Sequence, residues 1–162
     1  MPRATALPPD AMITDPAVER RPLSSSVGAY LEAIWAAAGT GCASTKEVAA
    51  QLSVSPASVT NMFVRLRADG LVEYERYRGA SLTRRGREEA LRLVRRRRLI
   101  ETFLVERLGY SWREAQEEQR GNGPFPSSAR FAERLAEFLG HPECDPHGHP
   151  IPGADGAPAP EN

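Results

Sequence analysis

The stretch from residue 53 to residue 71 constrains the fold more than any other part of the chain. Ser55 is a favourable N-cap, and Pro56 suits the first helical position, where its missing N–H is not needed. Apolar side chains follow at helical spacing at Val59, Met62, Phe63 and Leu66. Gly70 is a suitable left-handed cap. The pattern predicts an amphipathic helix that begins at Pro56 and ends before Gly70.

A second face of this predicted helix carries small or hydrogen-bonding side chains. Ser58, Asn61 and Arg65 fall together on it, with Ala57 and Thr60 beside them. Such side chains suit a helix that lies in the major groove of DNA. The alternative is an ordinary amphipathic surface helix, and the neighbouring stretches weigh against it.

Two further helices are predicted before this one. The first spans about residues 26–38 and has a wide apolar face. The second follows Ser44, an N-cap that forms a capping box with Glu47. The tight turn between the second helix and the one at Pro56 matches a helix-turn-helix. Cys42, in the loop before Ser44, is interpreted as a small buried apolar group.

A two-stranded hairpin is predicted over residues 71–83, as in the wing of a winged helix. Its β-favouring side chains are Val72, Tyr74 and Tyr77. Arg78 and Gly79 form its turn, and Arg76 and Arg78 at the tip suit phosphate contacts. The alternative for these two arginines is solvated surface charge.

A long helix capped by Thr83 is predicted to end at Gly109, and it contains a run of four arginines, residues 95–98. A four-residue run wraps around a helix, so not all four can face solvent. Arg97 shares a side with apolar residues and must be paired or extend its charged end to water. The other three are interpreted as solvated or close to phosphates.

Two shorter helices complete the predicted, mostly α-helical fold. One follows a capping box at Ser111 and runs from Trp112 to about Arg120, and the other runs from about Ser127 to a cap at Gly140. The apolar faces along residues 99–139 favour a dimer. The predicted architecture is a winged helix-turn-helix domain followed by an all-helical dimerisation domain.

Prolines mark the predicted ends of these domains, since five of the 14 precede residue 24 and six follow residue 140. We predict a disordered Pro-rich arm over residues 1–23 and a Pro-rich tail outside the core over residues 143–162. The DNA-binding domain is predicted over residues 24–88, and the dimerisation domain over residues 89–142.

Charge is divided unevenly along the chain, although the net charge is zero. Residues 24–109 carry 14 Lys or Arg against 9 Asp or Glu, whereas residues 110–162 carry 4 against 9. This division fits an anionic partner for the first half only. The chain shows no membrane-spanning run, no signal peptide and, with two cysteines, no disulfide framework, so we expect a cytoplasmic protein with no membrane partner.

Four blocks stand out in order: SVGAYLEAIW, SVSPASVTNMFVRLRADGLVEYERYRGASLTRRG, RRRRLIETFLVERLGYSW and LGHPECDPHGHPIP. Over about residues 24–152 they resemble the diphtheria-toxin-repressor family of metal-dependent regulators, especially its shorter manganese-responsive branch. The resemblance implies a homodimer on a palindromic double-stranded DNA operator, with divalent Mn or Fe as corepressor. It places the DNA-reading positions at Ser55, Ala57, Ser58, Thr60 and Asn61. An SH3-like third domain, found in the longer branch, is expected to be absent.

The resemblance also implies a metal site, from which this chain departs. Glu32 and Glu101 match family ligand positions. The remaining positions hold Ala29, Arg97, Gln116, Arg120, Gly123 and Pro124. Two carboxylates without imidazole cannot make the usual six-ligand site. We therefore expect DNA binding that is independent of metal or that uses another effector.

Arg97 is the residue that we expect to replace the metal. Its guanidinium can pair with Glu101 one turn on and with Glu32 from the first helix. Such a cation would join the first helix to the dimerisation core permanently. The alternative is a decayed site in which Arg97 merely reaches solvent.

A second candidate metal cluster lies near the C-terminus, where His141, Cys144, His147 and His149 fall within nine residues. These side chains could hold Zn or Fe. Against this interpretation, the segment is rich in proline, and much of it matches a family signature that exists without a local metal site.

The leading functional interpretation is a DNA-binding transcription regulator that acts as a repressor. The alternative is an interaction protein that pairs with a true metal-dependent regulator and modulates it. An enzyme is not expected: Cys144 with His147 could mimic a thiol–imidazole pair, but no third member or oxyanion donor is visible in the sequence.

Overall fold

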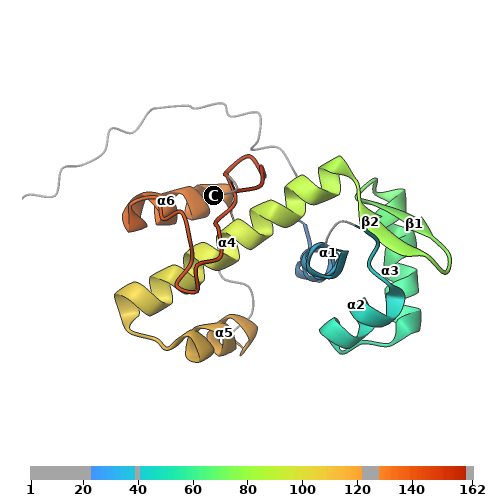
Figure 1. The fold of residues 1–162 in the computed structure, drawn as a ribbon, viewed down its shortest axis with the longest axis horizontal. Helices are drawn as coiled ribbons and strands as arrows, with labels where there is room; N and C mark the ends of the chain where they lie inside the picture. The colour runs from blue at the N-terminus through green and yellow to red at the C-terminus, as the bar shows by residue number, and fades with distance from the viewer. Residues whose placement is uncertain (1–22, 39–40, 122–127, 160–162) are drawn as a thin grey trace, which may run out of the picture.

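The computed structural model describes residues 23–38, 41–121 and 128–159. The described residues form six helices and one two-stranded sheet: α1 (Ser25–Ala38), α2 (Thr45–Leu52), α3 (Pro56–Ala68), β1 (Val72–Glu75), β2 (Gly79–Leu82), α4 (Arg84–Leu108), α5 (Trp112–Gly121) and α6 (Ala129–Leu139). The long helix α4 crosses the molecule, with α1–α3 and the hairpin at one end and α5 and α6 at the other (Figure 1). The predicted mostly α-helical winged fold is confirmed. None of the described helices has the length and hydropathy needed to cross a membrane.

Hydrogen bonds at the helix ends follow the predicted caps. The Ser44 hydroxyl accepts the Glu47 N–H at 3.1 Å, and the Glu47 carboxylate accepts the Ser44 N–H at 2.9 Å. The Ser55 hydroxyl accepts the Ser58 N–H at 3.2 Å, directly before Pro56. These caps fix the starts of α2 and α3, and the Ser53 N–H bonds back to the Ala50 carbonyl at the end of α2, so the predicted helix-turn-helix is confirmed.

The hairpin pairs β1 and β2 antiparallel, with Val72 opposite Leu82 and Glu75 opposite Gly79. The main chain of Ala80 also bonds to Ala43, which joins the wing to the loop before α2. The start of α4 lies against the chain that enters β1: a methyl group on Gly86 would lie 1.8 Å from the Leu71 carbonyl oxygen. The glycine therefore permits the close approach of α4 to the wing.

Two hydrophobic clusters hold the fold together. The first is formed by α1–α3, the hairpin and Ala90 of α4, and its large, fully buried side chains include Phe63, Leu31 and Ile34. The second lies between the end of α4, α5 and α6, and includes Leu99. Because α4 contributes to both clusters, the two ends of the molecule share one continuous helix. Residues 1–22 of the predicted arm lie outside the described residues.

The segment after α6 is part of the core, so the prediction of a tail outside the core is wrong for this part. Ile151 is 6% exposed and belongs to the second cluster, and Pro152 is fully buried. Arginines of α4 bind this segment through its backbone carbonyls. The donor and acceptor pairs are Arg92 with Asp155, Arg95 with Pro152 and Arg98 with Pro150.

These contacts correct the prediction that Arg95 and Arg98 are solvated or near phosphates, since their side chains are only 13% and 12% exposed. Arg95 also pairs with Glu133 of α6. An irregular, proline-rich chain leaves carbonyl oxygens without partners, and guanidinium groups satisfy them. The prediction that Cys42 is buried is also wrong, because the loop before α2 leaves it exposed.

Asp145 organises the turn at the start of this segment. One of its carboxylate oxygens accepts the backbone N–H groups of His147 and His149, each at 2.9 Å, and the other lies 3.0 Å from the His149 ring. Burial raises the pKa of Asp145, but these hydrogen bonds outweigh burial and hold the pKa below its ordinary value. The charged carboxylate therefore stabilises the folded protein above the ordinary pKa of about 3.8.

We expect Asp145→Asn to lower the free energy of unfolding at pH 7 by about 1–3 kcal/mol, because a buried charge-assisted network loses its anion. The difference from the wild type should shrink as the pH falls below about 4, since the wild-type carboxylate is then protonated as well. Urea unfolding at several pH values measures both effects. Asp155→Asn, at an exposed turn, is the control. A difference that stays constant down to pH 2 would contradict this role of the charge.

Candidate nucleic-acid interface

Helix α3 is amphipathic as predicted. Val59, Phe63 and Leu66 are fully buried, and the opposite side carries Ser58 and Asn61. The predicted DNA-reading residues at Ser55, Ala57, Ser58, Asn61 and Arg65 are all exposed, and Thr60 is half-buried. A shallow hollow beside this face is lined by Ser26, Tyr30, Ser58, Asn61, Met62 and Arg65. The fold therefore brings three of the predicted residues, Ser58, Asn61 and Arg65, to one accessible surface.

The wing carries the other predicted contacts. Arg78 forms an exposed ion pair with Glu75 at 3.1 Å, and the Arg76 guanidinium lies 5.1 Å from the centre of the Tyr77 ring. The Tyr77 side chain is itself almost completely exposed. Exposed pairs of this kind contribute little to stability, so both arginines can exchange their partners for phosphates.

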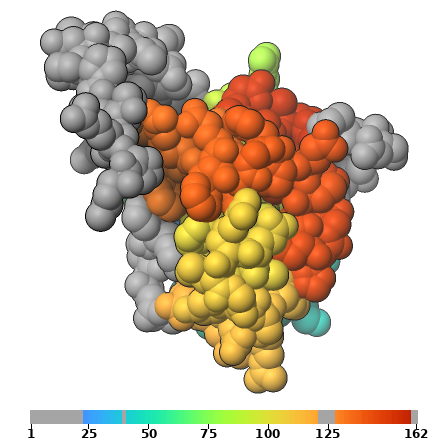
Figure 2. All heavy atoms as spheres, turned by 90° about the vertical axis from the view of Figure 1, so that its left-hand side faces the viewer, coloured from blue at the N-terminus to red at the C-terminus, as the bar shows by residue number. Residues whose placement is uncertain are grey.

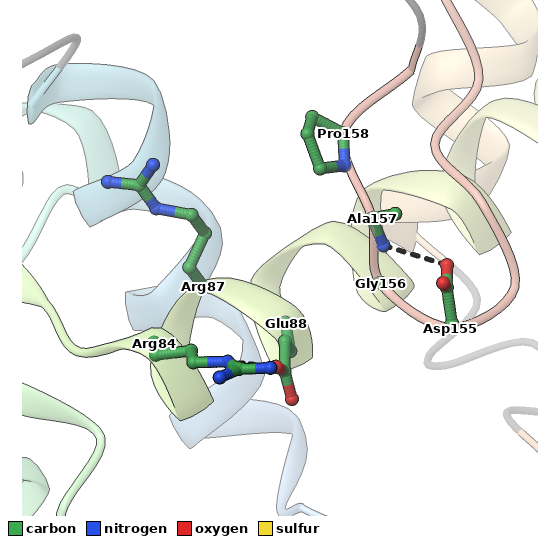
Figure 3. Close-up of a pocket in the computed structure, with 7 residues that line it drawn as sticks. All are labelled: Arg84, Arg87, Glu88, Asp155, Gly156, Ala157 and Pro158. Atoms are coloured by element: carbon green, nitrogen blue, oxygen red, sulfur yellow. Dashed lines mark hydrogen bonds and ion pairs between the residues drawn. The ribbon is translucent and has the colours of Figure 1, made fainter.

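Further arginines at the start of α4 were not singled out from the sequence. Arg84, Arg85 and Arg87 are exposed and follow the wing directly. Arg84 pairs with Glu88 along the helix, and Arg87 points away from this pair (Figure 3). Arg85 donates to the Asp69 carbonyl. The signal in the sequence was the basic segment TRRGR next to the hairpin, which extends the positive charge of the wing.

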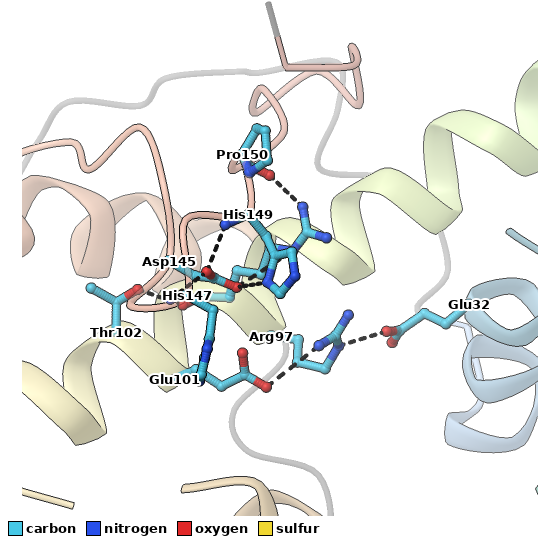
Figure 4. A network of polar contacts seen from close by, with 9 residues as sticks. Glu32, Arg97, Glu101, Thr102, Asp145, His147, His149 and Pro150 are labelled. Atoms are coloured by element: carbon cyan, nitrogen blue, oxygen red, sulfur yellow. Dashed lines mark hydrogen bonds and ion pairs between the residues drawn. The ribbon is translucent and has the colours of Figure 1, made fainter. Parts of the chain in front are cut away.

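An ion-pair bridge joins α1 to α4 at the positions of the predicted metal site (Figure 4). The Arg97 Nε lies 2.9 Å from a Glu32 carboxylate oxygen, and an Arg97 terminal nitrogen lies 3.4 Å from a Glu101 carboxylate oxygen. The Glu101 side chain is 3% exposed, whereas Arg97 and Glu32 are partly exposed. The pairing of Arg97 with both carboxylates, predicted from the sequence, is confirmed.

Electrostatics favour a permanently charged Arg97. Burial alone would lower the pKa of Arg97, but Glu32 and Glu101 raise it above its ordinary value. Burial raises the pKa of Glu101, and Arg97 opposes that shift. The guanidinium thus compensates the buried carboxylate of Glu101 and holds the exposed end of Glu32 toward α4.

The donor set at this position does not fit a divalent metal ion. In the part of the chain that the structure describes, no three His, Cys, Asp or Glu side chains are grouped to hold one. Between Glu32 and Glu101 lies a guanidinium, which has no lone pair to offer and repels a cation. The positions at Ala29, Gln116 and Arg120 carry no carboxylate, imidazole or thiolate, and Gly123 and Pro124 lie outside the described residues.

The second candidate cluster is not assembled into one group in the described structure. The His149 ring faces Asp145, and the His147 ring packs edge-on against Trp112 at a centroid distance of 4.2 Å. Cys144 is exposed beside a backbone bridge to Pro150. His141 follows the C-terminal cap of α6 with φ 55°. His149 and His147 therefore already have partners within the fold, Asp145 and Trp112 respectively.

The other end of the molecule exposes apolar side chains. Figure 2 shows this face, which is formed by the end of α4 together with α5 and α6. Phe138 is 62% exposed and Leu108 is 55% exposed. The Phe138 ring lies 6.0 Å from that of Phe103 and 5.6 Å from the Arg107 guanidinium. Exposed aromatic and aliphatic groups next to an arginine are typical of a protein–protein interface.

A capped helix-turn-helix, a wing with exposed arginines and a separate helical domain define a winged-helix DNA-binding regulator. Comparisons with known proteins agree. Residues 22–80 match the family model of the N-terminal DNA-binding domain of iron-dependent repressors, and residues 83–153 match the model of their metal-binding and dimerisation domain. The chain belongs to the iron-dependent repressor family, whose members include the regulators MntR and IdeR. Members of this family are transcriptional repressors, not enzymes.

Three relatives illustrate the range of similarity. A helix-turn-helix transcriptional regulator of Methanocaldococcus jannaschii is 39% identical over 59% of this chain and 78% of its own. MntR of Lysinibacillus sphaericus is 46% identical over 41% of this chain and 48% of its own. A solved manganese-dependent transcriptional repressor in complex with manganese is 38% identical, with a TM-score of 0.70 over 84% of this chain and 62% of its own. The chain thus spans about half to just over three quarters of the length of these three proteins.

Proposed function

We propose that this protein is a homodimeric transcriptional repressor that binds a palindromic DNA operator in the cytoplasm without requiring a divalent metal. Binding to DNA is supported by the exposed face of α3, which carries Ser58, Asn61 and Arg65 above a fully buried opposite face. Small side chains on this face make few direct base contacts, so phosphate contacts and DNA shape should carry much of the affinity.

The homodimer is supported by the apolar face at the end of α4, α5 and α6. Two copies joined there would be related by a twofold axis, and each would present one α3 to DNA. An operator with matching half-sites follows from that symmetry. Sedimentation equilibrium of the purified protein measures the dimer, and we expect Phe138→Glu to give a monomer.

Independence from metal is supported by the Arg97 bridge, which carries this part of the proposal. Related repressors are manganese-dependent or iron-dependent, and a solved structure of one is a complex with manganese. Here a fixed cation already pairs Glu32 of α1 with Glu101 of α4. The guanidinium thus supplies the positive charge that attracts both carboxylates, so no bound metal ion is needed for this attraction.

The test is DNA binding by the full chain on the region upstream of its own gene. Affinity should be the same, within twofold, in chelator and in added Mn, Fe or Zn. Asn61→Ala should weaken binding several-fold, because it removes an amide from the exposed α3 face. Binding only with metal would overturn metal independence. A monomer with no DNA affinity would instead favour an interaction protein.

A further inference from the structure

Tyr77, at the tip of the wing, combines a strained backbone conformation with an exposed side chain. Tyr77 has φ 70°, in the left-handed region that bulky residues rarely adopt. The Arg78 N–H donates to the Glu75 carbonyl at 3.1 Å, so residues 75–78 form a turn with Tyr77 at its third position. A positive φ at this position is the signature of a type II turn, which favours glycine or asparagine there.

Burial does not compensate for this conformation. The Tyr77 side chain is 91% exposed, the most exposed of the large hydrophobic residues in the described chain. Its ring lies 5.1 Å from the Arg76 guanidinium, and a cation–π contact at an exposed site is weak. The fold therefore holds a large ring in a strained, solvated position from which stability gains almost nothing.

We propose that Tyr77 is a DNA-contacting residue whose ring packs against the deoxyribose wall of a groove while Arg76 and Arg78 bind the flanking phosphates. This inference rests on the proposed DNA-binding function. Charge selects the partner: Arg76 and Arg78 flank Tyr77 in the sequence, and Arg84, Arg85 and Arg87 follow at the start of α4. Figure 1 places the hairpin at the end of the molecule that also carries α3.

The amphipathic ring fits this contact better than a contact with phosphate alone. Deoxyribose offers an apolar surface, and the phenol hydroxyl can donate to an oxygen at its edge. Sugar and phosphate contacts carry no sequence information directly. Tyr77 should therefore strengthen binding to all DNA and position the protein, while α3 provides the discrimination between sequences.

The test compares Tyr77→Gly with the wild type in its melting temperature and in its affinity for DNA. If Tyr77 had only a structural role, the two quantities would fall together. Glycine relieves the positive φ, so the melting temperature should stay the same or rise by about 2–4 °C. Affinity for DNA should nevertheless fall about tenfold, since the buried area of the ring is lost. The fall should be equal on the operator and on a scrambled duplex of the same length.

Two further variants separate the ring from its neighbouring charges. Tyr77→Phe keeps the ring and should bind within about threefold of the wild type. Arg76→Gln should reduce the dependence of affinity on salt concentration by about one counterion, whereas Tyr77→Gly should leave that dependence unchanged.

Three outcomes would overturn the proposal for Tyr77. They are wild-type affinity in Tyr77→Gly, a loss of affinity that parallels a loss of stability, and a loss confined to the operator. Absence of wild-type binding to any DNA is a different result, because it would overturn the proposed function itself.

Discussion

Arg97→Ala is expected to weaken operator binding at least tenfold in the presence of chelator, because it cuts the electrostatic link between α1 and α4. The structure shows that link as two contacts, at 2.9 Å to Glu32 and 3.4 Å to Glu101. Without the guanidinium, α1 keeps its apolar contacts but loses the ion pair between Glu32 and Arg97. Fluorescence anisotropy with labelled operator DNA measures the loss.

A change in stability accompanies this substitution and must be separated from the effect on binding. The Glu101 side chain is 3% exposed in the native chain, and Arg97→Ala removes the guanidinium that pairs with its carboxylate. Removing one partner of a buried pair costs several kcal/mol, and partial exposure of Arg97 reduces that here to about 1–3 kcal/mol.

The double variant Arg97→Ala/Glu101→Gln removes the uncompensated charge and should recover most of the stability. It should still bind DNA poorly, because Glu32 has lost its 2.9 Å ion pair with Arg97. Arg97→Lys is the conservative control: it keeps a positive charge but loses the planar, two-sided geometry, so an intermediate affinity is expected. A double variant that binds DNA as tightly as the wild type would show that the bridge has no role in DNA binding.

Gly86→Ala is expected to destabilise the protein by at least about 2 kcal/mol, the opposite of what helix propensity predicts. Alanine in a helix normally stabilises it by about 1 kcal/mol relative to glycine. Here a methyl group would lie 1.8 Å from the Leu71 carbonyl oxygen, which already accepts the Thr83 N–H at 3.1 Å. Because that oxygen belongs to backbone fixed at the start of the wing, α4 itself must move.

Gly28→Ala is the matched control for this substitution. Gly28 also lies in a helix, α1, but a methyl group there would lie 3.4 Å from a flexible Leu93 side chain. The change should be neutral or stabilising. Thermal unfolding of both variants measures the contrast, and equal melting temperatures would show that the approach of α4 to Leu71 is not tight in solution.

Local chemistry made much of the fold predictable. Ser44 with Glu47, Ser55 before Pro56, and Thr83 each cap a helix through hydrogen bonds within four residues, so the sequence alone specifies these boundaries. The pairing of Arg97 with Glu101 was predictable for the same reason, since the two residues lie one helical turn apart. The partner on α1 came from the family resemblance.

Non-local contacts were not predictable in the same way. The association of residues 143–159 with α4 depends on hydrogen bonds from Arg92, Arg95 and Arg98 to backbone carbonyls more than 50 residues away. Because every residue has a backbone carbonyl, the sequence does not indicate which of them accepts such a bond. Likewise, the strained turn at Tyr77 and the close approach at Gly86 are backbone geometry. The sequence pattern of a proline-rich tail is the same whether the segment is solvated or packed.

The continuity of α4 has a consequence for how this chain can change during evolution. Its 25 residues join the two clusters without a linker, and each residue of an α-helix adds about 1.5 Å and about 100° of rotation. Inserting one residue between Ala90 and Leu99 would turn α3 by more than a quarter of a circle relative to α5 and α6. We therefore expect related chains to keep the length of this stretch of α4 constant. Where the spacing of their recognised DNA sites differs, the change should lie at the ends of α4.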